Sequence, residues 1–209
     1  MIWIKRSLFG SVKKTVWLGF LVILGLVIFQ HKEVQAVFGI GIIKQDVEMS
    51  PEIKGRLTEN GKPIVGATIA RTIVYEGYKK GQEQLQHTVT DDEGRFSFPK
   101  MTVKSRYPKD IFGQNALVGM GVYYENKDTL YQIWHSSSSW QALRAPIPDL
   151  LLQLDCDLNN KKITYVIDTT DLNSEQYKVE QLASSICYFI NDKATAYLND
   201  EVINSFDDI

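Results

Sequence analysis

The sequence has few of the residues that usually carry catalysis, and it shows no catalytic pattern among them. Its 209 residues include three histidines, His31, His87 and His135, and two cysteines. No pair of histidines has the spacing of a zinc site. The chain also lacks a G-x-S-x-G elbow, a P-loop and a dinucleotide-binding fingerprint. We therefore predict a protein that is not an enzyme and that uses no metal or cofactor.

Positive charge is scarce outside the N-terminal segment. Of the 23 basic and 25 acidic residues, 18 and 24 lie beyond residue 36, which gives the remainder a net charge of about −6. An acidic surface repels phosphate backbones, and no basic stripe with interleaved aromatic residues is present. These features exclude nucleic acid as a predicted partner.

One long hydrophobic run is present, over residues 15–29. Four basic residues, Lys5, Arg6, Lys13 and Lys14, precede it. Positive charge is retained on the cytoplasmic side of a membrane, so the rest of the chain is expected to be exported. A run of this length fits a signal-peptide core, whereas a membrane-spanning helix prefers about 17–25 apolar residues. Residues 1–36 are thus either a signal peptide, with Val34 and Ala36 suited to cleavage, or an uncleaved membrane anchor.

The two cysteines, Cys156 and Cys187, both lie in the part expected to be exported. In an oxidising compartment a single pair of cysteines favours a disulfide bond over a catalytic thiol. The alternative is two buried free thiols.

Turn residues and alternating apolar residues predict strands after residue 52. We expect residues 37–52 to be a tether and residues 53–209 to be a domain that begins with the strand Ile53–Leu57. Asn60-Gly61 is a dipeptide that tolerates positive φ and suits a tight hairpin turn. The strand that follows places Ile69, Ile73 and Tyr75 on one side.

A second turn is expected at Asp91–Gly94, where it would close a second hairpin with Phe96 and Phe98 facing inward. Further strands are indicated over four ranges: Leu117–Tyr124, Thr129–His135, Leu150–Cys156 and Ile163–Asp168. Many short strands separated by turns are typical of a β-sandwich, so we predict a mainly β fold.

The C-terminal part suggests a different element. Between Ser174 and Ile190 the apolar residues Val179, Leu182, Ala183, Ile186, Cys187 and Ile190 follow helical spacing. Asn173 and Gln176 are placed for a capping box. We predict one amphipathic helix over Ser174–Ile190 that covers the sandwich and brings Cys187 to Cys156.

Two segments, IKGRLTENGKPIVGATIA and TVTDDEGRFSFP, resemble the carboxypeptidase regulatory-like, or transthyretin-like, β-sandwich module. The residues that carry this resemblance are Gly61, Pro63, Gly66, Ala67, Thr90, Asp91, Gly94, Phe96 and Phe98. All belong to turns or the core, so the resemblance implies a fold and no catalytic residue. Hydrolases of 5-hydroxyisourate in this superfamily end in Tyr-Arg-Gly-Ser, whereas this chain ends in NSFDDI. The wider sequence also resembles a group of uncharacterised Gram-negative envelope proteins, some near type VI secretion genes, which implies a periplasmic location.

Aromatic residues beside serines are the best candidates for a binding surface. We select Tyr123, Trp134, His135 and Trp140, around the sequence WHSSSSW, because tyrosine and tryptophan are enriched in contact surfaces. The alternative is that these side chains belong to the core or to ordinary surface.

The leading hypothesis is a non-enzymatic periplasmic module that binds another protein. Its specific form is an immunity or accessory protein for a secreted toxin, because an acidic surface suits a basic partner. The membrane is a further partner if the N-terminal segment stays uncleaved. The alternative hypothesis is a carbohydrate- or envelope-binding structural module in which the aromatic residues stack on sugars.

Overall fold

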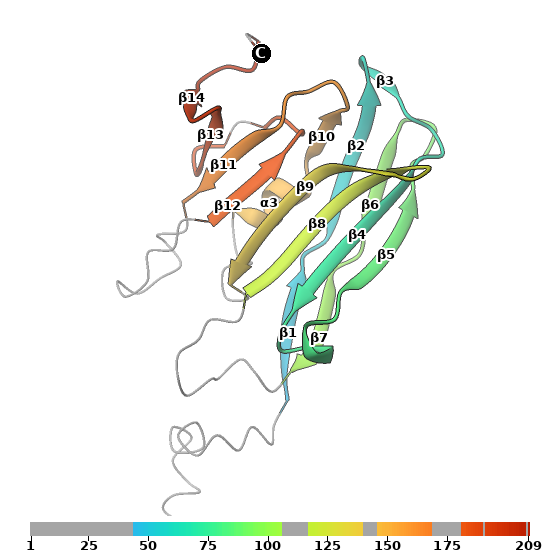
Figure 1. Cartoon of the computed structure of the whole chain (residues 1–209), viewed down its shortest axis with the longest axis vertical. Coiled ribbons are helices and arrows are strands. Elements are labelled where there is room, and N and C mark those ends of the chain that lie inside the picture. The colour runs from blue at the N-terminus through green and yellow to red at the C-terminus, as the bar shows by residue number, and fades with distance from the viewer. Residues whose placement is uncertain (1–43, 106–116, 140–145, 169–180, 190, 208) are drawn as a thin grey trace, which may run out of the picture. The chain divides into compact units, whose positions relative to one another are not determined.

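The computed structural model describes residues 44–105, 117–139, 146–168, 181–189, 191–207 and 209 (Figure 1). These residues belong to one unit of the chain. The hydrophobic run at residues 15–29 and the candidate Trp140 lie outside the described residues. In the part of the chain that is described, no helix is both long and apolar enough to cross a membrane.

The described residues form strands and two short helices. In chain order the elements are β1 (Gln45–Ser50), β2 (Ile53–Glu59), β3 (Lys62–Pro63), β4 (Thr68–Tyr75), the 3₁₀ helix η1 (Lys79–Gly81), β5 (Gln84–Val89), β6 (Arg95–Phe98), β7 (Met101–Ser105), β8 (Leu117–Asn126), β9 (Thr129–Ser139), α3 (Ile147–Leu151), β10 (Leu154–Asp157), β11 (Ile163–Ile167), β12 (Gln181–Ser185), β13 (Ala194–Leu198) and β14 (Glu201–Ile203).

The largest sheet has eight strands in the order β14-β13-β11-β12-β9-β8-β4-β5. A second sheet has the order β10-β2-β3, and β6 also pairs with β2. The strands β1 and β7 form a separate antiparallel pair. The pairing of β10 with β2 is parallel, whereas the other pairings are antiparallel. Figure 1 shows β2 and β6 behind the strands β4, β8 and β9 of the large sheet.

The sheets share one hydrophobic core, which alternation along the strands creates. Ile69, Ile73 and Tyr75 of β4 are buried on one side, as predicted. Phe96 and Phe98 of β6 join the same core, also as predicted, and their rings make an edge contact at 6.4 Å between centroids. The fold is therefore mainly β, and its shared core is consistent with a β-sandwich.

The first predicted turn is confirmed. The strands β2 and β3 form a hairpin in which Glu59 pairs with Lys62. The two residues between them, Asn60 and Gly61, have φ values of 54° and 74°. Two consecutive positive φ values characterise the type I′ turn, which Asn-Gly favours because these residues adopt the left-handed region at little cost.

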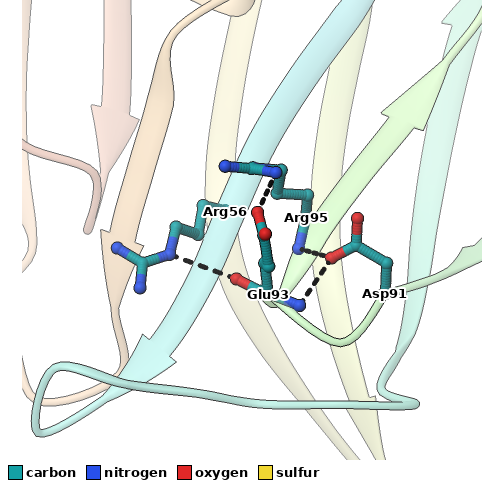
Figure 2. Close-up of polar contacts among 4 residues, drawn as sticks. All are labelled: Arg56, Asp91, Glu93 and Arg95. Carbon is teal, nitrogen blue, oxygen red and sulfur yellow. Dashed lines mark hydrogen bonds and ion pairs between the residues drawn. The ribbon is translucent and has the colours of Figure 1, made fainter.

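The second turn forms, but it does not close a hairpin. The side chain of Asp91 accepts hydrogen bonds from the backbone N–H groups of Glu93 and Arg95, at 2.9 and 2.8 Å (Figure 2). Arg56 Nε donates to the carbonyl oxygen of Glu93, at 3.1 Å. However, β5 before the turn pairs with β4, whereas β6 after it pairs with β2. The turn therefore carries the chain from one sheet to the other.

Three other predicted boundaries are wrong. The expected tether contains the strand β1, whose side chains Val47 and Met49 are fully buried. The strand expected over Leu150–Cys156 begins as the helix α3 and becomes β10 only at Leu154. The serine run that we placed beside a strand end belongs to β9, in which Ser136 and Ser138 point into the core.

The predicted C-terminal helix is also wrong wherever its residues are described. Gln181–Ser185 is the strand β12, which lies between β9 and β11. Its buried residues are Gln181, Ala183 and Ser185, while Leu182 is exposed. The buried face of this strand is thus largely polar, so the positions of its apolar residues do not show the alternation of a half-buried strand. Pairing with the two neighbouring strands, rather than the local pattern, determines that this segment is extended. Residues 174–180 and 190 lie outside the described residues.

The predicted disulfide bond is present. Cys156, in β10, is bonded to Cys187, just after β12. The bond therefore connects the second sheet to a segment that follows a strand of the eight-stranded sheet. It closes a loop with a sequence separation of 31 residues.

A buried arginine lies among the apolar residues of β4. Arg71 Nη1 donates hydrogen bonds to the carbonyl oxygen of Pro99, at 2.8 Å, and to Ser50 Oγ, at 3.1 Å, while Nη2 donates to Gln86 Oε1. Its guanidinium also lies 4.9 Å from the centre of the Phe98 ring. Burial lowers the pKa of Arg71 from 12.5 to about 10, so the side chain remains charged at neutral pH. Arg71 thereby links β4 to β1, β5 and the segment after β6.

Candidate functional site

The predicted binding residues have different environments. Trp134 is fully buried, and its indole Nε1 donates a hydrogen bond to Ser136 Oγ, at 3.0 Å. It is a core residue, so its selection as a surface contact is wrong. Tyr123 is half-buried and His135 is exposed. Of the selected residues that the structure describes, only these two are available to a partner.

Tyr123 and His135 lie next to each other on the outer face of the eight-stranded sheet. Gly121 of β8 pairs directly with His135 of β9. The ring of Tyr123 lies over Gly121, where an added Cβ would overlap it. A bulge opposite Val122 and Tyr123 places Ile133 and Trp134 in the core and leaves His135 outside. The two candidates therefore belong to one continuous surface.

This surface extends across the neighbouring strands. Ser184 of β12 pairs with His135 on one side and with Thr164 of β11 on the other, and Thr164 in turn pairs with Tyr197 of β13. We call ten adjacent outward-facing residues of these five strands the neutral face; Glu125, which also faces outward from β8, lies beyond them near the end of that strand. The residues of the neutral face are Tyr123, Gln132, His135, Ser137, Thr164, Val166, Leu182, Ser184, Thr195 and Tyr197.

The neutral face contains no Asp, Glu, Lys or Arg, although 23% of the whole sequence is charged. Its exposed hydrophobic residue, Leu182, has a relative exposure of 54%. Charged residues lie at its borders. Lys162 Nζ donates a hydrogen bond to Gln132 Oε1, at 3.1 Å, and Gln132 Nε2 donates to Ser184 Oγ, at 3.3 Å. These contacts hold the ammonium group of Lys162 at the margin of the face.

Part of the neutral face is hollowed into a groove of about 590 Å³. The groove lies over β11, β12 and β13, and its lining combines hydroxyl, amide and aliphatic groups with one charge of each sign. Lys162 precedes β11 and Asp200 follows β13, and the pairing of Thr164 with Tyr197 places both charges at the same end of these strands. The lining residues are Lys162, Thr164, Val166, Leu182, Ser184, Tyr197, Asn199 and Asp200. None of these residues could be selected from the sequence, because their clustering depends on the position of β12.

Outside the neutral face, the carboxylate of Asp157 is occupied by contacts within the fold. Asp157 accepts hydrogen bonds from Thr58 Oγ1 at 2.8 Å and from the backbone N–H groups of Gly61 at 2.8 Å and Asn159 at 2.9 Å. Its carboxylate thus fixes the β2–β3 turn onto β10. Over the described ranges, no group of three or more His, Cys, Asp or Glu side chains could hold a metal ion.

The residues that carry the resemblance to the carboxypeptidase regulatory-like module also serve the fold. Thr90 Oγ1 accepts a hydrogen bond from the N–H of Ala67, at 2.8 Å, and donates to the carbonyl oxygen of Ile64, at 2.6 Å. Gly94 has a φ of 75°, and an added Cβ would lie 2.5 Å from the carbonyl oxygen of Leu57. These residues therefore join the two turns within the fold.

Comparison with known proteins assigns the chain to a family through its sequence. Neither a search of curated proteins nor a search of solved structures found a match. One family model matches residues 53–161, a range that covers β2 to β10 and reaches just past them. The chain belongs to this family, which is described as a domain of unknown function, DUF6795.

Proposed function

We propose that this protein is a non-enzymatic periplasmic module that binds another protein through the neutral face. The observation that carries the proposal is the lack of charged side chains among the ten adjacent outward-facing residues of the neutral face, which spans five neighbouring strands and leaves Glu125 of β8 at its margin. Depletion of charge, together with aromatic residues, distinguishes the centre of protein interfaces from the rest of a surface. The hydroxyl and amide groups on this face provide the hydrogen bonds that such an interface needs.

The rigidity of the face supports binding. Its residues project from paired strands rather than from loops, so little conformational entropy is lost when a partner docks. The net negative charge of the chain beyond residue 36 favours encounter with a basic partner, because complementary charge increases association rates. An immunity or accessory protein that blocks a secreted toxin is the specific form of this proposal.

The alternative of a carbohydrate-binding module has less support. A sugar-stacking platform needs exposed aromatic rings, and Trp134, one of the four selected residues, is buried. The rings of Tyr123 and Tyr197 are half-buried on the neutral face. A pull-down with isolated peptidoglycan tests this alternative directly, and retention that depends on Tyr123 would favour it over protein binding.

The test is capture of the partner with matched variants. The tagged protein is expressed in its host, and complexes are purified from the periplasmic fraction. Thr164→Lys places a charge at the centre of the neutral face, whereas Thr102→Lys makes the same change at an exposed position of β7. We expect a stoichiometric protein partner with the unmodified protein and with Thr102→Lys, and at least a tenfold loss with Thr164→Lys. Equal recovery with both variants, or repeated recovery of the protein alone, would count against the proposal.

A further inference from the structure

The strand β5 forms one margin of the eight-stranded sheet, and it differs in composition from the other edge strands. Its sequence, QLQHTV, contains no Asp, Glu, Lys, Arg or Pro. Natural edge strands usually carry such residues because these block pairing with another chain. Among the described strands, each of the other edges has at least one: Glu201 in β14, Asp155 in β10, Lys62 and Pro63 in β3, Arg95 in β6, Asp46 in β1 and Lys104 in β7.

The register of β5 shows which backbone groups face outward. Thr90 N–H donates to the carbonyl oxygen of Ala67, at 3.0 Å, and the pairing continues with Thr68 opposite Val89. Antiparallel neighbours exchange both hydrogen bonds at every second residue. The backbone N–H and C=O groups of Leu85, His87 and Val89 therefore point away from β4, towards the margin that Figure 1 shows.

The side chains along this edge suit an extended apolar segment. Leu85 and Val89 have relative exposures of 54% and 59% and lie on the outer face of the sheet. The pairing of β5 with β4 contains no bulge. A strand added at this edge would therefore find both hydrogen-bonding groups and apolar contacts in regular register.

Contacts on both faces hold β5 in place. On the inner face, Gln86 accepts a hydrogen bond from the buried Arg71. On the outer face, His87 Nε2 and Glu125 Oε1 are 3.1 Å apart. A preorganised edge loses less entropy when a ligand binds. These contacts make β5 a rigid template.

The charges around β5 indicate the partner. Asp91 and Asp92 follow the strand directly, and Glu83 precedes it. Lys79 Nζ donates a hydrogen bond to Gln84 Oε1, at 2.7 Å, so the end of the strand without a neighbouring cation from this segment is the one at Asp91 and Asp92. If a second copy paired with Leu85 of one chain against Val89 of the other, Glu83 would lie opposite Asp91 at both ends. Like charges directly opposite each other destabilise a sheet. A basic residue beside Asp91 and Asp92 would instead complement them.

We propose that the β5 edge binds an extended segment of a partner protein by strand addition. The segment has apolar or β-branched residues next to Leu85 and Val89 and a Lys or Arg beside Asp91 and Asp92. This inference rests on the proposed function, since it specifies how a protein partner would be engaged, but it concerns a different surface from the neutral face.

The test uses displayed random 12-residue peptides, selected against the full chain, followed by fluorescence anisotropy with the most enriched peptide. His87→Pro removes one outward N–H without breaking the pairing with β4, and Leu85→Lys adds a charge to the edge. Val202→Lys is the matched control on the opposite edge strand, β14, because Val202 has an exposure of 53%. Thermal unfolding checks that each variant folds. If His87→Pro does not fold, the result with Leu85→Lys decides the test.

We expect the selected peptides to combine β-branched residues with a basic end, and to bind at least tenfold more weakly to His87→Pro and Leu85→Lys. Binding to Val202→Lys should stay within twofold. Hydrogen exchange should slow at the amides of Leu85, His87 and Val89 when the peptide binds. Failure to enrich a peptide, unchanged binding to the two edge variants, or protection elsewhere would overturn the proposal.

Two further outcomes separate this proposal from its alternatives. Light scattering that shows a dimer abolished by Leu85→Lys would mean that a second copy occupies the edge, and this would overturn the proposal. Thr164→Lys should leave peptide affinity unchanged. Loss of partner capture with this variant while the peptide still binds would support both proposals. Unchanged partner capture with Thr164→Lys would contradict only the proposed function. Absence of peptide binding at the β5 edge would contradict only the strand-addition proposal.

Discussion

At the scale of single residues, Asp157 has a pKa that depends on its hydrogen bonds. Desolvation alone would raise this pKa. Hydrogen bonds from the backbone N–H groups of Gly61 and Asn159, and from the side chains of Thr58 and Asn159, outweigh it and hold the pKa well below its usual value. A carboxylate with a lowered pKa stabilises the fold above the pKa of the unfolded state, about 3.9, and this contribution is lost as the pH falls further.

We therefore expect Asp157→Asn to lower the free energy of unfolding by about 1–2 kcal/mol at pH 7, from the loss of charge-assisted hydrogen bonds at a half-buried site. The difference from the unmodified protein should shrink below about pH 4, because the carboxylate of the unfolded chain takes up a proton there while the native carboxylate, with its lowered pKa, stays ionised. Urea unfolding between pH 2.5 and 7 measures both effects. Asp155→Asn, at an exposed position of the same strand, should change stability by less than about 0.5 kcal/mol at every pH. A difference for Asp157→Asn that stays constant with pH would contradict the argument.

Two glycines with similar backbone angles provide a second comparison. Gly61 and Gly94 have φ values of 74° and 75°, but a Cβ on Gly61 would meet no atom within 4 Å, whereas one on Gly94 would lie 2.5 Å from the carbonyl oxygen of Leu57. Gly61→Ala should cost about 1–2 kcal/mol, the cost of the left-handed conformation. Gly94→Ala should cost at least about 2 kcal/mol more, because the backbone of β2 must also move. Chemical unfolding of the two variants compares them, and equal costs would show that the contact with Leu57 relaxes freely.

At the scale of elements, the alternating sequences were predictable and the pairing of distant strands was not. The pattern of β4 and the Asn-Gly dipeptide identified strands and a turn from local chemistry alone. By contrast, β12 has the buried polar residues Gln181 and Ser185, so its exposed Leu182 suggested a helical stripe. The parallel pairing of β10 with β2 joins segments about a hundred residues apart, and no local pattern encodes it.

The candidate site followed the same division. Tyr123 and His135 could be selected from their residue types, and the structure brings them together through Gly121. The burial of Trp134 could not be predicted from the sequence, because a bulge in β9 changes the alternation of buried and exposed residues at that point. The rest of the neutral face depends on β12, which the helical prediction removed from the sheet. Arg71 was missed because an arginine inside an apolar strand contradicts the alternation rule that identified the strand.

The disulfide bond is a property of the elements that it connects. Cross-linking a loop of this length should stabilise the fold by about 3–4 kcal/mol in the chain-entropy model. We expect the double variant Cys156→Ala and Cys187→Ala to lose about this amount in chemical unfolding, and to be insensitive to added reductant. The unmodified protein should lose a similar amount when it is reduced. A reduced protein as stable as the oxidised one would show that the bond is dispensable for folding.

At the scale of the whole molecule, the expected location can be tested independently of any partner. We predict that residues 1–43, fused to alkaline phosphatase, direct the enzyme to the periplasm, where it folds and is active. Deletion of residues 15–29 should abolish this activity, because the hydrophobic run is what is recognised for export. The mass of the mature chain distinguishes the alternatives at Ala36, since a signal peptide would be removed and an anchor would remain. Activity that survives the deletion would contradict export by this segment.

The position of β12 has a consequence for where the folding unit of this chain ends. The family model ends at residue 161, before the strands β11 to β14 that complete one half of the eight-stranded sheet. A polypeptide that stopped there would leave β9 without its neighbour and Cys156 without its bonded cysteine. The segment that the family model matches is thus shorter than the part of this chain that folds together, because it leaves out half of the large sheet and one cysteine of the disulfide bond.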